Sequence, residues 1–297
     1  MNRDVCQCEN HAGVGFSLIV SYHDGNTRNT DPEYYYRHRK GGSFEASSVR
    51  SRLAQILYNL GERLESKPKP MAKLSRELIA ETYLRGEGIE IGALHNPLKA
   101  PSSANVKYVD RLAVAQLREQ YPELNDKKLV EVDILDDGER LSTIPDSSQD
   151  FVIANHFVEH CQDPMGAVQA MLRVLKPGGI LYLAIPDKRC CFDADRPVTP
   201  IDHLMRDHLE GPEWSRRQHF EEWVRLVNKI SDETEAQKKI AELIGKNYSI
   251  HFHAWTPFEM MEFFVALRKM TPFEIDLCLH HDGVEVIFIL RNLERTA

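Results

Sequence analysis

Three acidic side chains accompany short apolar runs in the middle of the sequence. Glu90 lies in the first run, Asp110 ends the second and Asp133 ends the third. Asp110 follows Glu90 by 20 positions (110 − 90), a spacing at which a carboxylate can accept hydrogen bonds from ribose hydroxyls. Asp133 is suitably placed to accept from an exocyclic adenine amine, with Ile134 packing on the ring. Together the three acids indicate a ligand that contains a nucleoside.

A glycine turn follows the first acid. The stretch reads Gly88-Ile-Glu-Ile-Gly92-Ala93-Leu-His-Asn96. Gly92 can turn sharply and admit a ligand against bare backbone. Asn96 tolerates a positive φ, so we expect it to substitute for a later turn glycine.

Histidines supply the candidate bases. His156 directly follows an apolar run at 151–154, and His203 and His253 stand in or beside a long charged segment, 188–252. Histidine is the natural base near neutral pH. A divalent metal bound by His and Asp is an alternative, but the spacing is not compact, so we expect no metal. A third interpretation is a solvated helical cap whose histidines make ordinary hydrogen bonds.

Strands and helices alternate around these residues. Strands are predicted at 89–91, 106–109, 129–132, 151–154 and 179–185, and helices at 74–83, 112–121 and 165–175. Such alternation implies a parallel sheet with right-handed crossovers. A capping box at 256–259 opens a helix to about 269, and apolar runs at 273–279 and 284–290 flank an Asp-Gly turn, which predicts an antiparallel hairpin.

These motifs resemble those of the class I S-adenosylmethionine-dependent methyltransferases, in the branch called methyltransferase type 11. The resemblance is carried by Glu90-Ile-Gly92, Asp110-Arg111, Asp133, the stretch 150–160 (DFVIANHFVEH) and the turn 175–179 (LKPGG), and it covers about 89–187. It implies an α/β fold: a Rossmann-like, seven-stranded, mostly parallel sheet with a terminal antiparallel hairpin.

The same resemblance implies the cofactor, S-adenosylmethionine, and the roles of the residues that match. Glu90 and Gly92 would contact the methionine portion, Asp110 the ribose and Asp133 the adenine. The backbone around Asn155 and His156 would face the sulfonium and the amino group.

One position departs from the family pattern. A second glycine usually follows two positions after Gly92, and Leu94 stands there instead. We therefore expect a different loop path from Ala93 to Asn96.

Five segments are expected along the chain: a weakly ordered arm at 1–50, a helical extension at 51–86, a cofactor-binding core at 87–187, a substrate-covering insertion at 188–252, and a helix and hairpin at 253–297 that complete the sheet. Residues 16–22 within the arm are consistent with a short strand.

Composition narrows the function classes. With 37 basic and 45 acidic residues the formal net charge is −8, which argues against a nucleic-acid partner. No apolar run spans a bilayer, no secretory signal is recognised, and six cysteines in 297 residues form no disulfide framework. We expect a cytoplasmic enzyme with no membrane partner, and a homodimer stays open.

The sequence thus predicts methyl transfer to an oxygen or nitrogen of a small-molecule acceptor, such as a sugar or another hydroxylated metabolite. A non-catalytic binding or scaffold protein of the same fold is the first alternative. An NAD(P)-dependent oxidoreductase is the second, although Leu94 and Pro97 interrupt its glycine pattern.

Overall fold

The computed structural model describes residues 74–293, which fall within one compact unit. The predicted arm at 1–50, with its strand at 16–22, and the predicted helix that begins near 51 lie outside the described residues.

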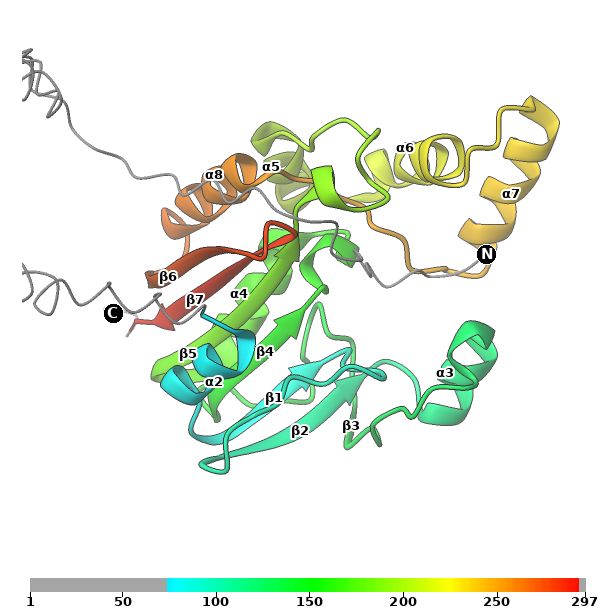
Figure 1. Cartoon of the computed structure of the whole chain (residues 1–297). Coiled ribbons are helices and arrows are strands. Elements are labelled where there is room, and N and C mark those ends of the chain that lie inside the picture. The colour runs from blue at the N-terminus through cyan, green and yellow to red at the C-terminus, as the bar shows by residue number, and fades with distance from the viewer. Residues whose placement is uncertain (1–73, 294–297) are drawn as a thin grey trace, which may run out of the picture. The chain divides into compact units, whose positions relative to one another are not determined.

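A seven-stranded sheet organises the described residues, in the order β3-β2-β1-β4-β5-β7-β6 (Figure 1). Its strands are β1 (Gly86–Ile91), β2 (Ala104–Asp110), β3 (Ile134–Leu135), β4 (Gln149–Asn155), β5 (Leu175–Pro186), β6 (Phe273–His281) and β7 (Glu285–Asn292). The first five strands pair in parallel, and β7 runs antiparallel to both β5 and β6. The predicted Rossmann-like sheet with a reversed last strand is confirmed.

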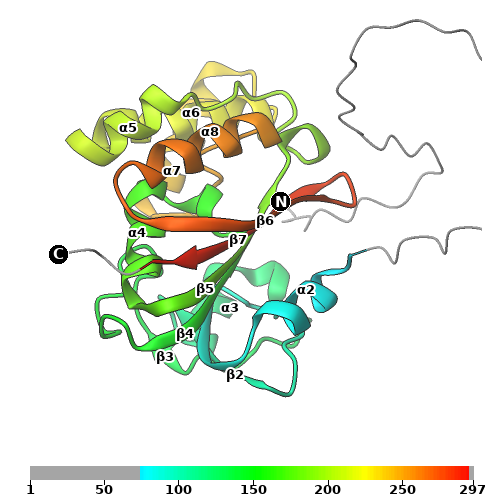
Figure 2. The ribbon, with the colours of Figure 1, turned by 90° about the vertical axis from the view of Figure 1, so that its left-hand side faces the viewer.

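Alternation along the strands sends apolar side chains to both faces of the sheet. In β4, Val152 and Ala154 pack in the cluster that α4 (Pro164–Val174) and α8 (Pro257–Arg268) complete. Phe151 and Ile153 point to the other face, against α2 (Arg76–Tyr83). Because both faces are covered, the central strands read as nearly continuous apolar runs. Figures 1 and 2 show α2 on the opposite side of the sheet from α4 and α8.

The terminal hairpin forms where it is predicted. Asp282 and Gly283 take positive φ values of 52° and 75°, which match the twist of the two flanking strands. At the start of α8, Oε2 of Glu259 accepts from the N–H of Thr256 at 3.0 Å and from its hydroxyl, which is the Glu259 half of the predicted capping box.

The third strand was predicted at the wrong place. Residues 129–132 form no strand, and β3 begins at Ile134. Leu129 instead packs with Leu117 of α3 (Val114–Gln120) and with Tyr121, which follows that helix, and the N–H of Val130 donates to the carbonyl of Leu94. The apolar run at 129–132 is therefore part of a loop whose side chains pack against α3. Asp133 precedes β3 and does not end a strand.

Helices follow β5 in the segment between 188 and 252. They are η4 (Lys188–Cys190), α5 (Ile201–Glu210), α6 (Glu213–Glu222), the π-helical turn η5 (Trp223–Val227) and α7 (Glu233–Gly245). Figure 1 shows α5, α6 and α7 above the sheet, on the side toward which β4 and β5 point. The remaining elements are α3 (Val114–Gln120) and the short helices η2 (Pro122–Leu124) and η3 (Val158–His160). Among residues 74–293, none of the helices combines the length and apolar character needed to cross a bilayer.

Candidate active site

A cavity of about 1110 Å³ opens at the carboxyl ends of the central strands. Glu90 and Gly92 of β1 and its turn, Asn155 of β4 and Pro186 of β5 line one side of it. Ligands of open α/β sheets bind beyond these strand ends, at the point where the strand order reverses. Here the order reverses between β1 and β4, so the cavity lies where the fold places a ligand.

The turn after β1 has two residues with positive φ, although only the first of them is a glycine. Gly92 has a φ of 65°, and Leu94 has a φ of 51°, in the left-handed region. The expectation that Asn96 takes this role is wrong, because Leu94 itself adopts the conformation. Leu94 packs against the apolar cluster of Leu117 and Tyr121, which offsets a strain of about 1–2 kcal/mol. Residues 92–96, including Ala93 and Asn96, line the cavity.

Glu90 brings an incompletely bonded carboxylate to the cavity. The residue is 1% exposed, and its Oε1 accepts a hydrogen bond from the N–H of Leu98 at 2.9 Å. Its buried Oε2 has no hydrogen-bond partner among the described residues. Burial raises the pKa of Glu90 to about 7, even though the bond from Leu98 favours the ionised form. A ligand that donates to Oε2 would satisfy this oxygen.

Asn155 presents a second unsatisfied polar group at the end of β4. Neither its amide nitrogen nor its amide oxygen has a hydrogen-bond partner among residues 74–293, and both atoms are buried. A buried amide without partners costs free energy unless a ligand or water bonds to it. Asn155 offers a donor and an acceptor, and Glu90 an acceptor, which fits the ammonium and carboxylate groups of an amino acid.

The other expected cofactor residues do not line this cavity, as far as the described chain shows. Asp110 ends β2 beside β1, and its Oδ1 accepts from the N–H of Leu112 at 3.3 Å. Arg111 is exposed and donates to the hydroxyl of Tyr121.

Asp133 and Ile134 lie farther along the same edge of the sheet. Oδ2 of Asp133 accepts from the N–H of Tyr108 at 2.8 Å, so this carboxylate bonds the edge of β2. Ile134 borders a different hollow, together with Lys107 and Ile144. The expectation of three carboxylates around one cleft is therefore wrong, because of the three only Glu90 lines the cavity, and the strand that Asp133 was expected to end begins after it.

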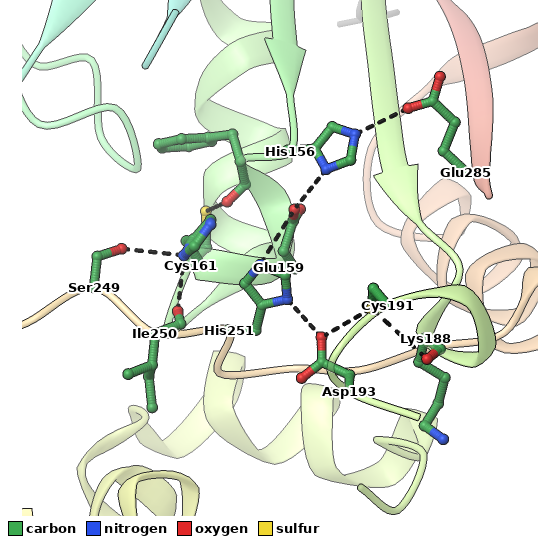
Figure 3. A network of polar contacts seen from close by, with 12 residues as sticks. His156, Glu159, Cys161, Lys188, Cys191, Asp193, Ser249, Ile250, His251 and Glu285 are labelled. Carbon is green, nitrogen blue, oxygen red and sulfur yellow. Dashed lines mark hydrogen bonds and ion pairs between the residues drawn. The ribbon is translucent and has the colours of Figure 1, made fainter. Parts of the chain in front are cut away.

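His156 belongs to an ionic network on the cavity wall, and Figure 3 shows its contact with Glu285. Its φ is 49°, and its Nε2 lies 2.9 Å from Oε2 of Glu285. Arg76 forms a bidentate ion pair with Glu285, and Nδ1 of His281 lies 2.9 Å from Oε1 of that carboxylate. Burial opposes the ionisation of Glu285, but the bonds from His156 and Arg76 outweigh it and lower the pKa to about 2. Glu285 is thus a permanent anion that orients His156.

The other ring nitrogen of His156 faces a fully buried acid (Figure 3). Nδ1 lies 3.7 Å from Oε1 of Glu159, which also lies 3.9 Å from Nε2 of His251. Burial raises the pKa of Glu159 above its ordinary value. Nδ1 of His251 lies 2.6 Å from Oδ2 of Asp193, so polar contacts continue from His156 toward the segment after β5.

His203 and His253, the other predicted bases, lie elsewhere. Neither is among the described residues that line the cavity, and both join Asp207 and His219 in a separate cluster. His253 is 1% exposed, and burial lowers its pKa well below the ordinary value. The structure therefore separates them from the strand ends, and only His156 of the three predicted bases lines the cavity.

Sequence reasoning missed Arg76, Glu285 and His281. Arg76 belongs to α2, ahead of β1, and the other two flank the turn between β6 and β7. A signal was present, because Glu285 introduces a charge into a strand that is otherwise apolar up to Leu290. Its partners, however, lie 129 and 209 positions away, where no local pattern shows them.

Part of the sequence matches a known protein family. Residues 88–183 match the sequence model of the family described as a methyltransferase domain. None of the curated proteins compared with this sequence matches it.

Among solved structures, a S-adenosylmethionine-dependent methyltransferase from Methanosarcina mazei is 20% identical, with 74% of this chain and 99% of that chain covered and a TM-score of 0.41. One from Aquifex aeolicus is 10% identical, with 72% and 86% covered and a TM-score of 0.39. A protein from Pyrococcus horikoshii is 16% identical, with 88% and 98% covered and a TM-score of 0.39.

The domain match spans β1 to β5, the strands that carry Glu90, Gly92 and Asn155 to the cavity. The strand order and the reversed β7 are those expected of the same family. S-adenosylmethionine, whose amino-acid portion fits the unsatisfied groups of Glu90 and Asn155, is its cofactor. Residues 88–183 are therefore similar to a methyltransferase domain, and the sheet around them has the strand order expected of the class I S-adenosylmethionine-dependent fold.

Proposed function

We propose that this enzyme transfers the methyl group of S-adenosylmethionine to an oxygen or nitrogen of a small, hydroxylated acceptor such as a sugar. The observation that carries the proposal is the cavity, whose volume of about 1110 Å³ joins the strand ends to the helices after β5. Ligand pockets commonly measure about 300–1,000 Å³ for one ligand. The cavity thus has room for the cofactor and an acceptor together.

The cofactor occupies the side of the cavity formed by β1 and β4 in this proposal. Glu90 accepts from the ammonium of its amino-acid portion, Asn155 bonds the carboxylate, and the backbone of 92–96 passes alongside. Asp110, at the end of the neighbouring β2, remains the predicted partner of the ribose hydroxyls. The cofactor supplies a methyl group on a sulfonium, which any aligned nucleophile can attack.

The acceptor lies on the opposite side, against the segment 188–252. Phe192 and Trp223 meet edge to face there with ring centroids 5.3 Å apart, and both line the cavity beside His251. Lys239 and Glu242 of α7 add charged groups to the same wall. Flat apolar faces next to hydrogen-bonding groups suit a ring that carries several hydroxyls. In this proposal, segment 188–252 covers the acceptor.

His156 acts as the general base. Nε2 of His156 lies 2.9 Å from Oε2 of Glu285 and 3.1 Å from Nη2 of Arg76, so this ion pair holds the imidazole at the cavity wall, where the ring takes a proton from the acceptor. The side chain of His156 is 37% exposed, against 4% for Glu285, so the imidazole is the member of the pair that the cavity reaches. A hydroxyl acceptor needs such a base, since it must lose its proton as the methyl group arrives.

A labelled-methyl transfer assay tests the proposal. The full chain is incubated with methyl-labelled S-adenosylmethionine and panels of sugars, phenols and amines. We expect label on one of these classes, and a loss of about 10²–10⁴-fold in the His156→Ala variant. Label that appears only on a macromolecule or a carbon acceptor, or none at all with a cofactor-saturated enzyme, would contradict it.

A further inference from the structure

Outside the cavity, four side chains from three separate segments converge on one point. His203 and Asp207 lie one turn apart on α5, His219 lies on α6, and His253 precedes α8. One nitrogen of each histidine and one oxygen of Asp207 all lie within 4.8 Å of one another. We call these four residues the histidine cluster.

The distances within the cluster are those of ligands around a small ion. Nε2 of His203 lies 3.0 Å from Nε2 of His219 and 3.1 Å from Oδ2 of Asp207. Nε2 of His253 lies 3.9 Å from the same oxygen. Tetrahedral Zn²⁺ with bonds of about 2.0–2.1 Å places its ligand atoms about 3.3 Å apart. Small shifts, which slightly separate His203 from its two neighbours and draw His253 inward, would therefore bring the four groups to bonding distance from one ion.

Burial leaves the cluster with an uncompensated group. Asp207 is fully buried, and its Oδ2, though near His203, has no aligned hydrogen-bond partner among the residues described. Its other oxygen, Oδ1, accepts from the hydroxyl of Ser215 at 2.8 Å, which fixes the orientation of the carboxylate. A buried carboxylate that faces three imidazoles is costly unless a cation or a proton joins them.

We propose that His203, Asp207, His219 and His253 bind one Zn²⁺ ion in a closed, structural site. Three imidazole nitrogens and one carboxylate oxygen suit zinc, and four protein ligands leave no open position for a reacting molecule. The ion ties α5, α6 and the chain before α8 together. His251, two residues before His253, lines the cavity, so the site holds part of the proposed acceptor wall in place.

The test is the metal content of the full chain, purified without a metal-affinity step. We expect about one zinc per chain, and Co²⁺ added to the metal-free protein should give the visible absorption of a tetrahedral site. Removal of the ion by a chelator should lower the melting temperature, and added Zn²⁺ should restore it.

Two variants locate the ion. Asp207→Asn is nearly isosteric and keeps an acceptor for Ser215, yet it removes the anionic ligand, so zinc affinity should fall by at least about tenfold. The matched control is His208→Ala on the same helix, where the imidazole contacts Asp163 instead of the cluster, and zinc content should be unchanged. Circular dichroism verifies that both variants fold.

Two results would overturn the proposal. One is wild-type protein that contains no zinc after expression in zinc-supplemented medium and shows no saturable Zn²⁺ binding. The other is bound zinc that neither Asp207→Asn nor His219→Ala weakens. Because metal content and melting temperature are read without any acceptor, the outcome is independent of the proposed methyl transfer.

Discussion

Replacing Glu90 with glutamine should stabilise the ligand-free enzyme above neutral pH and weaken its hold on the cofactor. Glutamine keeps an oxygen for the N–H of Leu98 and removes the buried charge. Burial raises the pKa of Glu90 from its ordinary value of 4.5 to about 7, so the folded protein holds this proton longer than the unfolded chain does. Stability from this group is complete below pH 4.5 and is lost as the pH rises through 7.

The size of this effect on the free energy of unfolding follows from the pKa shift of Glu90. At about 1.4 kcal/mol per unit of pKa, ionising Glu90 costs the folded state about 3 kcal/mol, of which about 2 kcal/mol falls between about pH 5.5 and 8. Urea unfolding of wild type and Glu90→Gln at these two pH values measures the difference. The stability gained by the variant should grow by about 2 kcal/mol from the lower pH to the higher.

The matched control is Glu87→Gln, an exposed residue of the same strand whose carboxylate accepts from Asn105. It should show no such pH-dependent gain. Cofactor affinity gives the second readout: the loss of a charge-assisted hydrogen bond should weaken binding by about 2 kcal/mol, or about 30-fold. If the variant Glu90→Gln has the same free energy of unfolding as wild type at both pH values and the same cofactor affinity, Glu90 is not a buried acid that binds the cofactor.

The remaining predictions concern the turn, the base and the acceptor wall. Leu94→Gly should be more stable than Leu94→Ala by about 1 kcal/mol in urea unfolding, because both lose the packing and only glycine relieves the positive φ; equal stabilities would contradict the strain. Glu285→Gln should lower kcat with little change in cofactor affinity, since it removes the anion that orients His156; steady-state kinetics with an unaltered kcat would count against this pair. Trp223→Ala should raise KM for the acceptor much more than KM for the cofactor, and the reverse pattern would place the acceptor elsewhere.

Local patterns in the sequence sufficed for most of the fold. Short apolar runs between amphipathic helices predict the parallel sheet, and Asp282-Gly283 predicts the reversed hairpin. The third strand was misplaced because the run at 129–132 is as apolar as a strand, and only its packing against α3 reveals a loop. That misplacement also misassigned Asp133.

The site was harder to predict, since its groups meet through tertiary structure. His156 was found because it directly follows a strand, whereas Glu285 and Arg76 come from segments that local spacing cannot relate to it. The sequence indicates His203 and His253 as candidate bases, but they are 50 positions apart (253 − 203), and only the fold shows that they meet. The spacing of the histidines along the sequence likewise does not show which of them are buried. Burial decides whether a histidine faces a ligand or another side chain.

Calorimetric titration of the full chain with S-adenosylhomocysteine examines most directly whether the cavity beyond β1 and β4 holds the methyl donor. We predict saturable binding at one site, weakened strongly in Asn155→Ala, whose lost amide would otherwise pair with the ligand. Absence of heat from S-adenosylhomocysteine, or saturable binding of NADH in its place, would contradict the account.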